Sequence, residues 1–179
     1  MRAFVSRMIL NLLIKKRPRW VTRVQLQILL DTTARAYAMP RKKIRSRTAR
    51  GALREYAAFT GQCMKYGKAD PVRVREEAYR TGNLIRRITG FRESHDIERL
   101  IFYLYRNLRI SMSGHIPGEI VVSRCYFERF YSPEQCALMS FVDEGIIAGI
   151  SGGGKLAFAE RITEGCGRCR ARFSRALQD

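Results

Sequence analysis

The sequence predicts an α+β fold, with a helical N-terminal half packed on a small antiparallel sheet and one long helix in the C-terminal half. In the first 109 residues, apolar side chains recur at the spacing of amphipathic helices. After the glycines at 152–154, apolar and polar side chains alternate as they do in strands. A length of 179 residues, 46% of them hydrophobic, fits a single domain that buries a core. Within it we expect a basic helical extension at 1–40, a helical part at 41–109 and a strand, helix and hairpin at 110–174.

Prolines and glycines divide the N-terminal half into five expected helices. Their ranges are 3–14, 20–37, 41–66, 71–89 and 94–109. The fourth helix begins after Asp70, ends at Gly90 and is expected to point Ile85 and Ile88 inward. The fifth has the strongest amphipathic pattern, with apolar residues at Ile97, Leu100, Ile101, Leu104 and Leu108.

The C-terminal half carries the clearest helix start in the chain. Ser132 is placed as the N-cap, Pro133 follows at the first helical position, and Gln135 completes a capping box. We expect this helix to run to about Gly149, after a strand at 118–124 and before a β-hairpin. The second strand of that hairpin should have an arginine face and an apolar face, the latter with Cys169, Ala171 and Phe173.

Two polar residues of this helix are candidate catalytic residues. Cys136 and Asp143 are seven positions apart, which is close to two helical turns, so both lie on one side. Met139 and Ile146 share that side, which is therefore the buried one. A buried carboxylate is costly unless it is paired or hydrogen-bonded. Asp143 is thus a candidate acid or base beside a cysteine nucleophile; alternatively, it hydrogen-bonds a neighbouring group in the core.

The C-terminal third also resembles a known family. The motifs that carry the resemblance are Arg124-Cys125, Cys136 with Asp143, Arg161-Ile162-Thr163-Glu164-Gly165, and Cys169 with Phe173. In this order they resemble the C-terminal part of the L-2-amino-thiazoline-4-carboxylic acid hydrolase family, over roughly residues 110–173, and the chain departs from that pattern at Ser140, Cys166 and Arg170. The resemblance implies hydrolytic opening of a small sulfur-containing ring. A weaker similarity is to plant carotenoid isomerases.

Four further residues complete the candidate site. Cys169 is a second candidate nucleophile, or else an inert cysteine packed in the core. Arg161 and Arg124 are candidate anchors for a substrate carboxylate, because a guanidinium binds carboxylates through two hydrogen bonds. His115, in a glycine-flanked loop, is a candidate general acid or base, although a lone loop histidine more often has no catalytic role.

The cysteines do not predict a metal or another cofactor. Cys166 and Cys169 form a CxxC motif, but Cys125 and Cys136 are eleven residues apart on different expected elements. Structural zinc sites usually take cysteines in close pairs, so we expect the four thiols not to bind zinc together. Five cysteines in a chain long enough to fold without disulfides favour reduced thiols and a cytoplasmic location.

Positive charge is concentrated near the N-terminus. The chain has a formal net charge of +18, and residues 1–50 contain 14 Lys and Arg against one acid, whereas residues 101–150 have a net charge of −1. The expected partner is a small-molecule substrate. A non-enzymatic adaptor that binds an anionic membrane surface or nucleic acid through residues 1–50 is the alternative, and would add a membrane-peripheral position. The apolar run at 8–14 is too short to span a bilayer.

Overall fold

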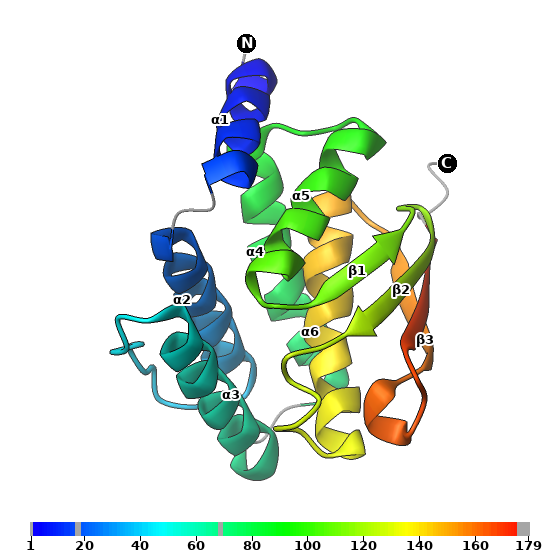
Figure 1. The fold of residues 1–179 in the computed structure, drawn as a ribbon. Coiled ribbons are helices and arrows are strands. Elements are labelled where there is room, and N and C mark those ends of the chain that lie inside the picture. The colour runs from blue at the N-terminus through cyan, green and yellow to red at the C-terminus, as the bar shows by residue number, and fades with distance from the viewer. Residues whose placement is uncertain (1, 17–18, 68–69, 175–179) are drawn as a thin grey trace.

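The structure of the protein, a computed structural model, describes residues 2–16, 19–67 and 70–174. Within these residues the α+β prediction is confirmed: six α-helices precede or interleave with one four-stranded antiparallel sheet (Figure 1). The helices are α1 (Arg2–Lys16), α2 (Arg19–Ala36), α3 (Ala49–Tyr66), α4 (Pro71–Thr89), α5 (Ser94–Asn107) and α6 (Pro133–Ser151). The strands are β1 (Ser111–Gly114), β2 (Gly118–Arg124), β3 (Lys155–Glu160) and β4 (Cys169–Ser174), with a 3₁₀ turn, η1 (Ile162–Glu164), between the last two.

Helix α6 is the centre of the fold. In Figure 1 it runs through the middle of the molecule, with α4 along it, the sheet on one side and the α2–α3 pair on the other. The predicted start is confirmed, because the Ser132 side chain accepts a hydrogen bond from the Gln135 N–H and the Gln135 side chain accepts one from the Ser132 N–H. The helix ends where Gly152 adopts the left-handed conformation, with φ 83°.

The sheet covers α6 with its apolar face. Its strand order is β1-β2-β4-β3, and Ile120 lies opposite Ala171 while Val122 lies opposite Cys169. Strand β4 alternates buried and exposed residues along its whole length, which confirms the predicted arginine and apolar faces. On the outer face Arg170 is paired with Glu119 and Glu160 of the neighbouring strands, at 2.7 and 3.4 Å. Arg170 is therefore part of the solvent-exposed face of the sheet, where its charge is paired.

Three expectations about the elements were wrong in detail. Helix α3 begins at Ala49 and not at Arg41, because Thr48 caps it and residues 41–46 form a segment without regular secondary structure. Ile44 of that segment is buried, and Gln27 of α2 binds both the N–H of Ile44 and the carbonyl of Lys42. Strand β1 was not predicted, and Ile88 points to solvent.

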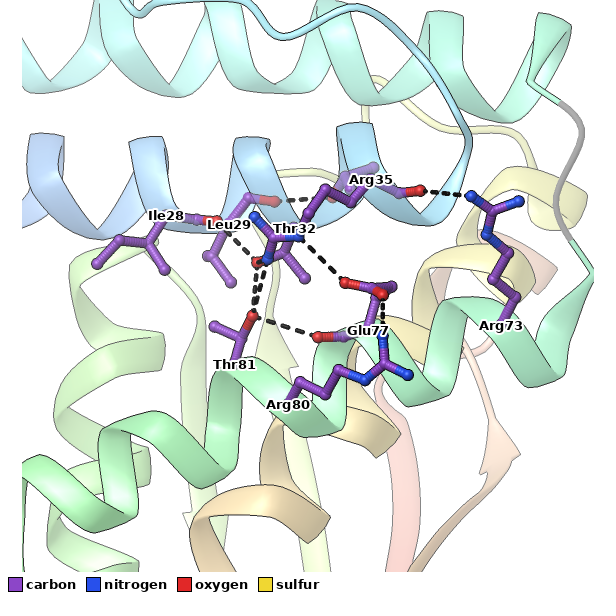
Figure 2. A network of polar contacts seen from close by, with 9 residues as sticks. Ile28, Leu29, Thr32, Arg35, Arg73, Glu77, Arg80 and Thr81 are labelled. Atoms are coloured by element: carbon purple, nitrogen blue, oxygen red, sulfur yellow. Dashed lines mark hydrogen bonds and ion pairs between the residues drawn. The ribbon is translucent and has the colours of Figure 1, made fainter.

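A polar network holds α2 against α4. Figure 2 shows the Thr32 and Thr81 hydroxyls meeting between the two helices, 2.8 Å apart, with Arg35 reaching across to Glu77 at 3.1 Å. Glu77 also binds Arg80, and Arg73 donates to the Arg35 carbonyl at 3.1 Å. Buried polar groups are stable only when hydrogen-bonded, and these partners fix the position of α2 as one wall of the cavity described next.

Candidate functional site

A largely apolar cavity of about 290 Å³ lies between the α2 wall and the inward side of α6. Helix α5, the segment that follows β2, and the η1–β4 region supply the other walls. Protein interiors are normally packed with few voids larger than one water molecule. A space of this size, lined by residues of all six helices, therefore has the dimensions of a small-molecule site and not of a packing defect.

Asp143 is the charged centre of the cavity. Its carboxylate accepts a hydrogen bond of 2.7 Å from the Tyr105 hydroxyl. Burial raises the pKa of Asp143 from about 3.8 to about 6; the Tyr105 hydrogen bond opposes that rise, and the nearby Glu144 charge adds to it. Burial likewise raises the pKa of Tyr105 well above its ordinary value. Tyr105 is therefore a hydrogen-bond donor at neutral pH, and Asp143 exchanges protons close to neutral pH.

Three thiols line the same cavity. Cys136 lies on α6 two turns before Asp143, Cys125 directly follows β2, and Cys169 begins β4. Burial raises the pKa of all three, that of Cys125 to about 12. The thiols are therefore protonated at neutral pH, and any nucleophilic role requires a base to remove the proton.

Neighbouring groups hold two of these thiols. The Cys169 sulfur accepts a hydrogen bond from the backbone N–H of Ile162, at 3.4 Å. The Thr163 hydroxyl lies beside Cys136 and makes no hydrogen bond to a nitrogen or oxygen among the described residues. Thr163 also belongs to the cavity lining, but its hydroxyl oxygen is itself buried.

The structure separates the predicted site residues into two groups. Cys136, Asp143 and Cys169 line one cavity, and the expected common side of Cys136 and Asp143 is observed. Arg161 stands behind this lining: its guanidinium donates to the Ser140 hydroxyl at 3.2 Å and to Glu164 at 3.1 Å. Its positive charge partly offsets the effect of burial on the pKa of Cys136 and of Cys169.

The remaining two candidates lie outside the cavity. Arg124 is exposed at the end of β2, and His115 is exposed in the turn between β1 and β2, 3.6 Å from Glu98 of α5. Neither residue lines the cavity with Asp143, because each is exposed to solvent. Among the described residues there is no cluster of three or more His, Cys, Asp and Glu side chains that could hold a metal ion.

Sequence reasoning missed Tyr105 and did not include Cys125 in the site. Tyr105 lies four residues after the buried Ile101, which is a helical signal for an inward position, but the sequence gives no sign of its partner. In the sequence, Cys125 is part of the Arg124-Cys125 motif of the family resemblance and one of the four thiols considered for zinc, but it is not among the predicted site residues. Its position at the end of a strand that covers α6 was the available signal for a site residue.

Comparison with known proteins adds no identification. No protein-family model matches the chain, and a search of curated proteins finds no significant match. The resemblance to thiazoline-carboxylate hydrolases therefore stays a prediction. No helix within the described ranges combines the length and the apolar character that crossing a membrane requires.

Proposed function

We propose that the protein is a hydrolase that opens a small, uncharged, ring-shaped substrate in the cavity. The observation that carries this proposal is the Asp143 carboxylate, which is held by Tyr105 in an otherwise apolar cavity beside three thiols. Carboxylates with raised pKa values in apolar pockets are a recurrent feature of acid–base catalysis. The resemblance to ring-opening hydrolases points to the same class of reaction.

Asp143 acts as the acid and base of the proposed reaction. A general acid or base works best when its pKa lies near the working pH, and burial brings the pKa of Asp143 to about 6. Tyr105 orients the carboxylate through its hydrogen bond, so that the second oxygen is left for the substrate or the nucleophile. Tyr105 is thus a positioning residue.

Cys136 is the proposed nucleophile, because helical spacing puts it on the side of α6 that carries the base. Asp143 takes the thiol proton as the sulfur adds to the carbon of the ring carbon–nitrogen double bond, and it passes that proton to the ring nitrogen. Water then replaces the Cys136 sulfur on this carbon, and a proton from that water returns to the thiol through Asp143. The carbon–nitrogen bond breaks as the new hydroxyl becomes a carbonyl and its proton passes through Asp143 to the departing nitrogen. Cys169, which lines the same cavity, is the alternative nucleophile.

The cavity walls favour a substrate without a carboxylate. Aliphatic and aromatic side chains dominate the lining, and Arg161 is engaged by Ser140 and Glu164 instead of facing the cavity. An anionic substrate would also be repelled by Asp143 in its ionised state. We therefore expect recognition by shape and apolar contact.

Turnover of a panel of 2-substituted thiazolines, each with and without a ring carboxylate, tests this function. The proposal expects hydrolysis of the uncharged members, and a loss of at least about a hundredfold in Asp143→Asn and Cys136→Ser. Cys166→Ser is the matched control, because Cys166 is a free thiol outside the cavity lining. Equal activity in Asp143→Asn and wild type would refute the role of the carboxylate.

A non-enzymatic adaptor is the second candidate, and the exposed cations at 41–50 favour it. Arg41, Lys42, Lys43, Arg45, Arg47 and Arg50 are all exposed, and none forms a salt bridge with another described residue. Such side chains remain free for an anionic partner. Binding of anionic surfaces without any turnover or binding of small molecules would favour the adaptor over the enzyme.

A further inference from the structure

Helices α1 and α2 expose an unusual set of large apolar side chains. On α1 these are Val5, Met8, Ile9 and Leu12, and on α2 they are Trp20, Val24 and Ile28, each between 42% and 62% exposed. We name these seven residues the apolar strip. Their spacings of three and four positions place them on one side of each helix. Contiguous apolar surface of this kind marks a binding face.

The strip of α1 points away from the body of the protein. The other side of α1 is anchored: Leu10 is buried, Arg7 pairs with Asp96, and Asn11 accepts a hydrogen bond of 2.6 Å from Arg99. Both of those partners belong to α5. The exposed side chains of α1 therefore have no partner among the described residues of the fold, although the helix itself is held in place.

The strip continues into the cavity. Trp20, Val24 and Ile28 belong both to the exposed strip and to the cavity lining. Leu13, which follows the last strip residue of α1, lines the cavity as well. The cavity mouth is thus set within an exposed apolar surface, so a ligand can pass from that surface to Asp143 along apolar walls.

Positive charge borders the strip on α2. The irregular segment at 41–46 runs beside α2, where Gln27 binds the Lys42 carbonyl at 2.9 Å and Arg23 binds the Ile44 carbonyl at 3.3 Å. Arg23 and Gln27 each lie one position before a strip residue, so the exposed Lys42 and Lys43 flank it. An apolar face bordered by lysine and arginine is the pattern of a segment that lies in an anionic membrane interface.

We infer that the apolar strip docks on an anionic lipid bilayer and that the cavity takes its uncharged substrate from the hydrocarbon through the mouth at Trp20, Val24 and Ile28. The substrate is accordingly a lipid-soluble ring compound, which deepens and rests on the function proposed above. The positive charge beside the apolar strip favours an anionic bilayer over a second copy of the chain, and the apolar side chains favour it over nucleic acid. A second copy of the chain would bring a further net charge of +18 against the same face, and nucleic acid offers phosphates but no apolar phase for the strip.

Trp20 supplies a direct probe, because it is the single tryptophan of the sequence and lies at the cavity mouth. The experiment mixes the full chain with vesicles of phosphatidylcholine containing about 30% phosphatidylserine, and follows both co-sedimentation and quenching of Trp20 by brominated acyl chains. We expect binding together with quenching. Binding should weaken in vesicles without phosphatidylserine and at about 0.5 M salt, because screening removes the electrostatic part.

A pair of matched variants separates docking from loss of structure. Met8→Ser/Ile9→Ser/Leu12→Ser removes exposed strip residues and should lower vesicle binding about tenfold or more. Leu84→Ser/Ile88→Ser removes exposed apolar residues of α4, which are 56% and 66% exposed, and should leave vesicle binding unchanged. Lys42→Glu/Lys43→Glu should weaken binding to the anionic vesicles, and the binding that remains should depend less on salt.

Loading of the cavity is measured with an uncharged apolar fluorescent dye, supplied either from water or dissolved in the vesicles. The strip variant should take up the dye from water at the wild-type rate and from vesicles about tenfold more slowly. If the dye does not bind from water, the proposed function of the cavity is contradicted, whereas vesicle binding would still support docking of the apolar strip. Asp143→Asn should bind vesicles as the wild type does.

Three outcomes would overturn the inference. One is vesicle binding without quenching of Trp20, which would mean attachment through the cations alone. Another is a gel shift with duplex DNA, in the absence of vesicle binding, that the strip variant leaves unchanged. The third is a dimer in sedimentation that the strip variant abolishes, in which case a second copy covers this face.

Discussion

The two sides of α6 are packed in opposite ways. Toward α4, Gly145 and Gly149 bring the backbones together so closely that a Cβ would lie 2.3 Å from the Arg75 carbonyl oxygen and 2.4 Å from that of Tyr79. Gly82 of α4 meets α6 with the same closeness. Toward α2 and α5, the same helix borders a cavity of about 290 Å³. Helix α6 is thus closely packed on its α4 side and borders a cavity on its other side.

The comparison teaches that the cavity is a local feature. On its α4 side, α6 packs glycine directly against backbone, so the interior of this protein is closely packed where no cavity lies. The opposite face is left open where Asp143, Cys136 and Cys169 are found, so the unfilled volume coincides with the reactive groups. The close α4 contact also fixes α6, which gives those groups a rigid support.

Gly149→Ala should have the largest effect, since the new methyl group meets the Tyr79 carbonyl and Asn83 of α4. We expect a loss of about 3 kcal/mol in the free energy of unfolding, measured with urea, even though alanine favours helix. Gly61→Ala in α3 is the control, because a Cβ there has no neighbour within 4 Å. It should gain about 0.5 to 1 kcal/mol. Similar results for both variants would remove the distinction between the two sides of α6.

Asp143→Asn should stabilise the protein while abolishing turnover. The folded-state pKa of Asp143, about 6, lies above the ordinary value of 3.8, so the stability contributed by its protonated form is complete below pH 4 and lost as the pH rises through 6. Asparagine stays neutral and can still accept the Tyr105 hydrogen bond. We therefore expect a gain of about 2 kcal/mol at pH 7.5 and almost none at pH 4. A gain that is equal at both pH values would contradict the raised pKa.

Tyr105→Phe should raise the pKa of Asp143 further, because the hydrogen bond that it removes stabilises the ionised carboxylate. The expected loss of stability is about 1.5 kcal/mol at pH 8, and smaller at pH 4, where the carboxyl group is protonated. Urea unfolding at the two pH values checks this difference. A lower pKa of Asp143 by NMR titration would be inconsistent with the observed contact.

Ser132→Ala should have the smallest effect, of about 1 kcal/mol, since it removes one side of the capping box at the start of α6. The measurement is again urea unfolding. Turnover in the cavity should remain within about twofold of wild type, because the cap lies a turn away from Cys136 and fraying there leaves Asp143 in place. A large loss of turnover would mean that the first turn of α6 itself forms part of the site.

Much of this architecture could be predicted because local signals define it. The Ser132-Pro133 start, the alternation in β4 and the apolar pattern of α5 each depend on residues a few positions apart. Helical spacing likewise brought Cys136 and Asp143 to one side. The irregular segment at 41–46 could not be predicted, because its course depends on Gln27 from another helix, and propensity alone favoured continuing the helix.

The cavity was beyond the reach of sequence patterns for a similar reason. Tyr105 and Asp143 are 38 positions apart, and only the packing of α5 on α6 brings them together. The glycines at 152–154 do end α6, as predicted, but the sequence pattern does not show that Gly149 marks the close approach of α4. His115 and Arg124 were included on residue type and resemblance, which do not say where a side chain points.

Binding of a small, uncharged apolar dye to a cavity-filling variant tests the central claim most directly. Leu104→Phe places extra volume in the cavity, and Leu84→Phe adds the same volume on the exposed surface of α4. If the inner side of α6 is a ligand site, Leu104→Phe changes the free energy of unfolding by less than about 1 kcal/mol, because the space exists, but weakens dye binding at least about tenfold while Leu84→Phe binds normally. A loss of about 3 kcal/mol in stability with unchanged dye binding would contradict the account, because it would mean that this side of α6 is as closely packed as the other.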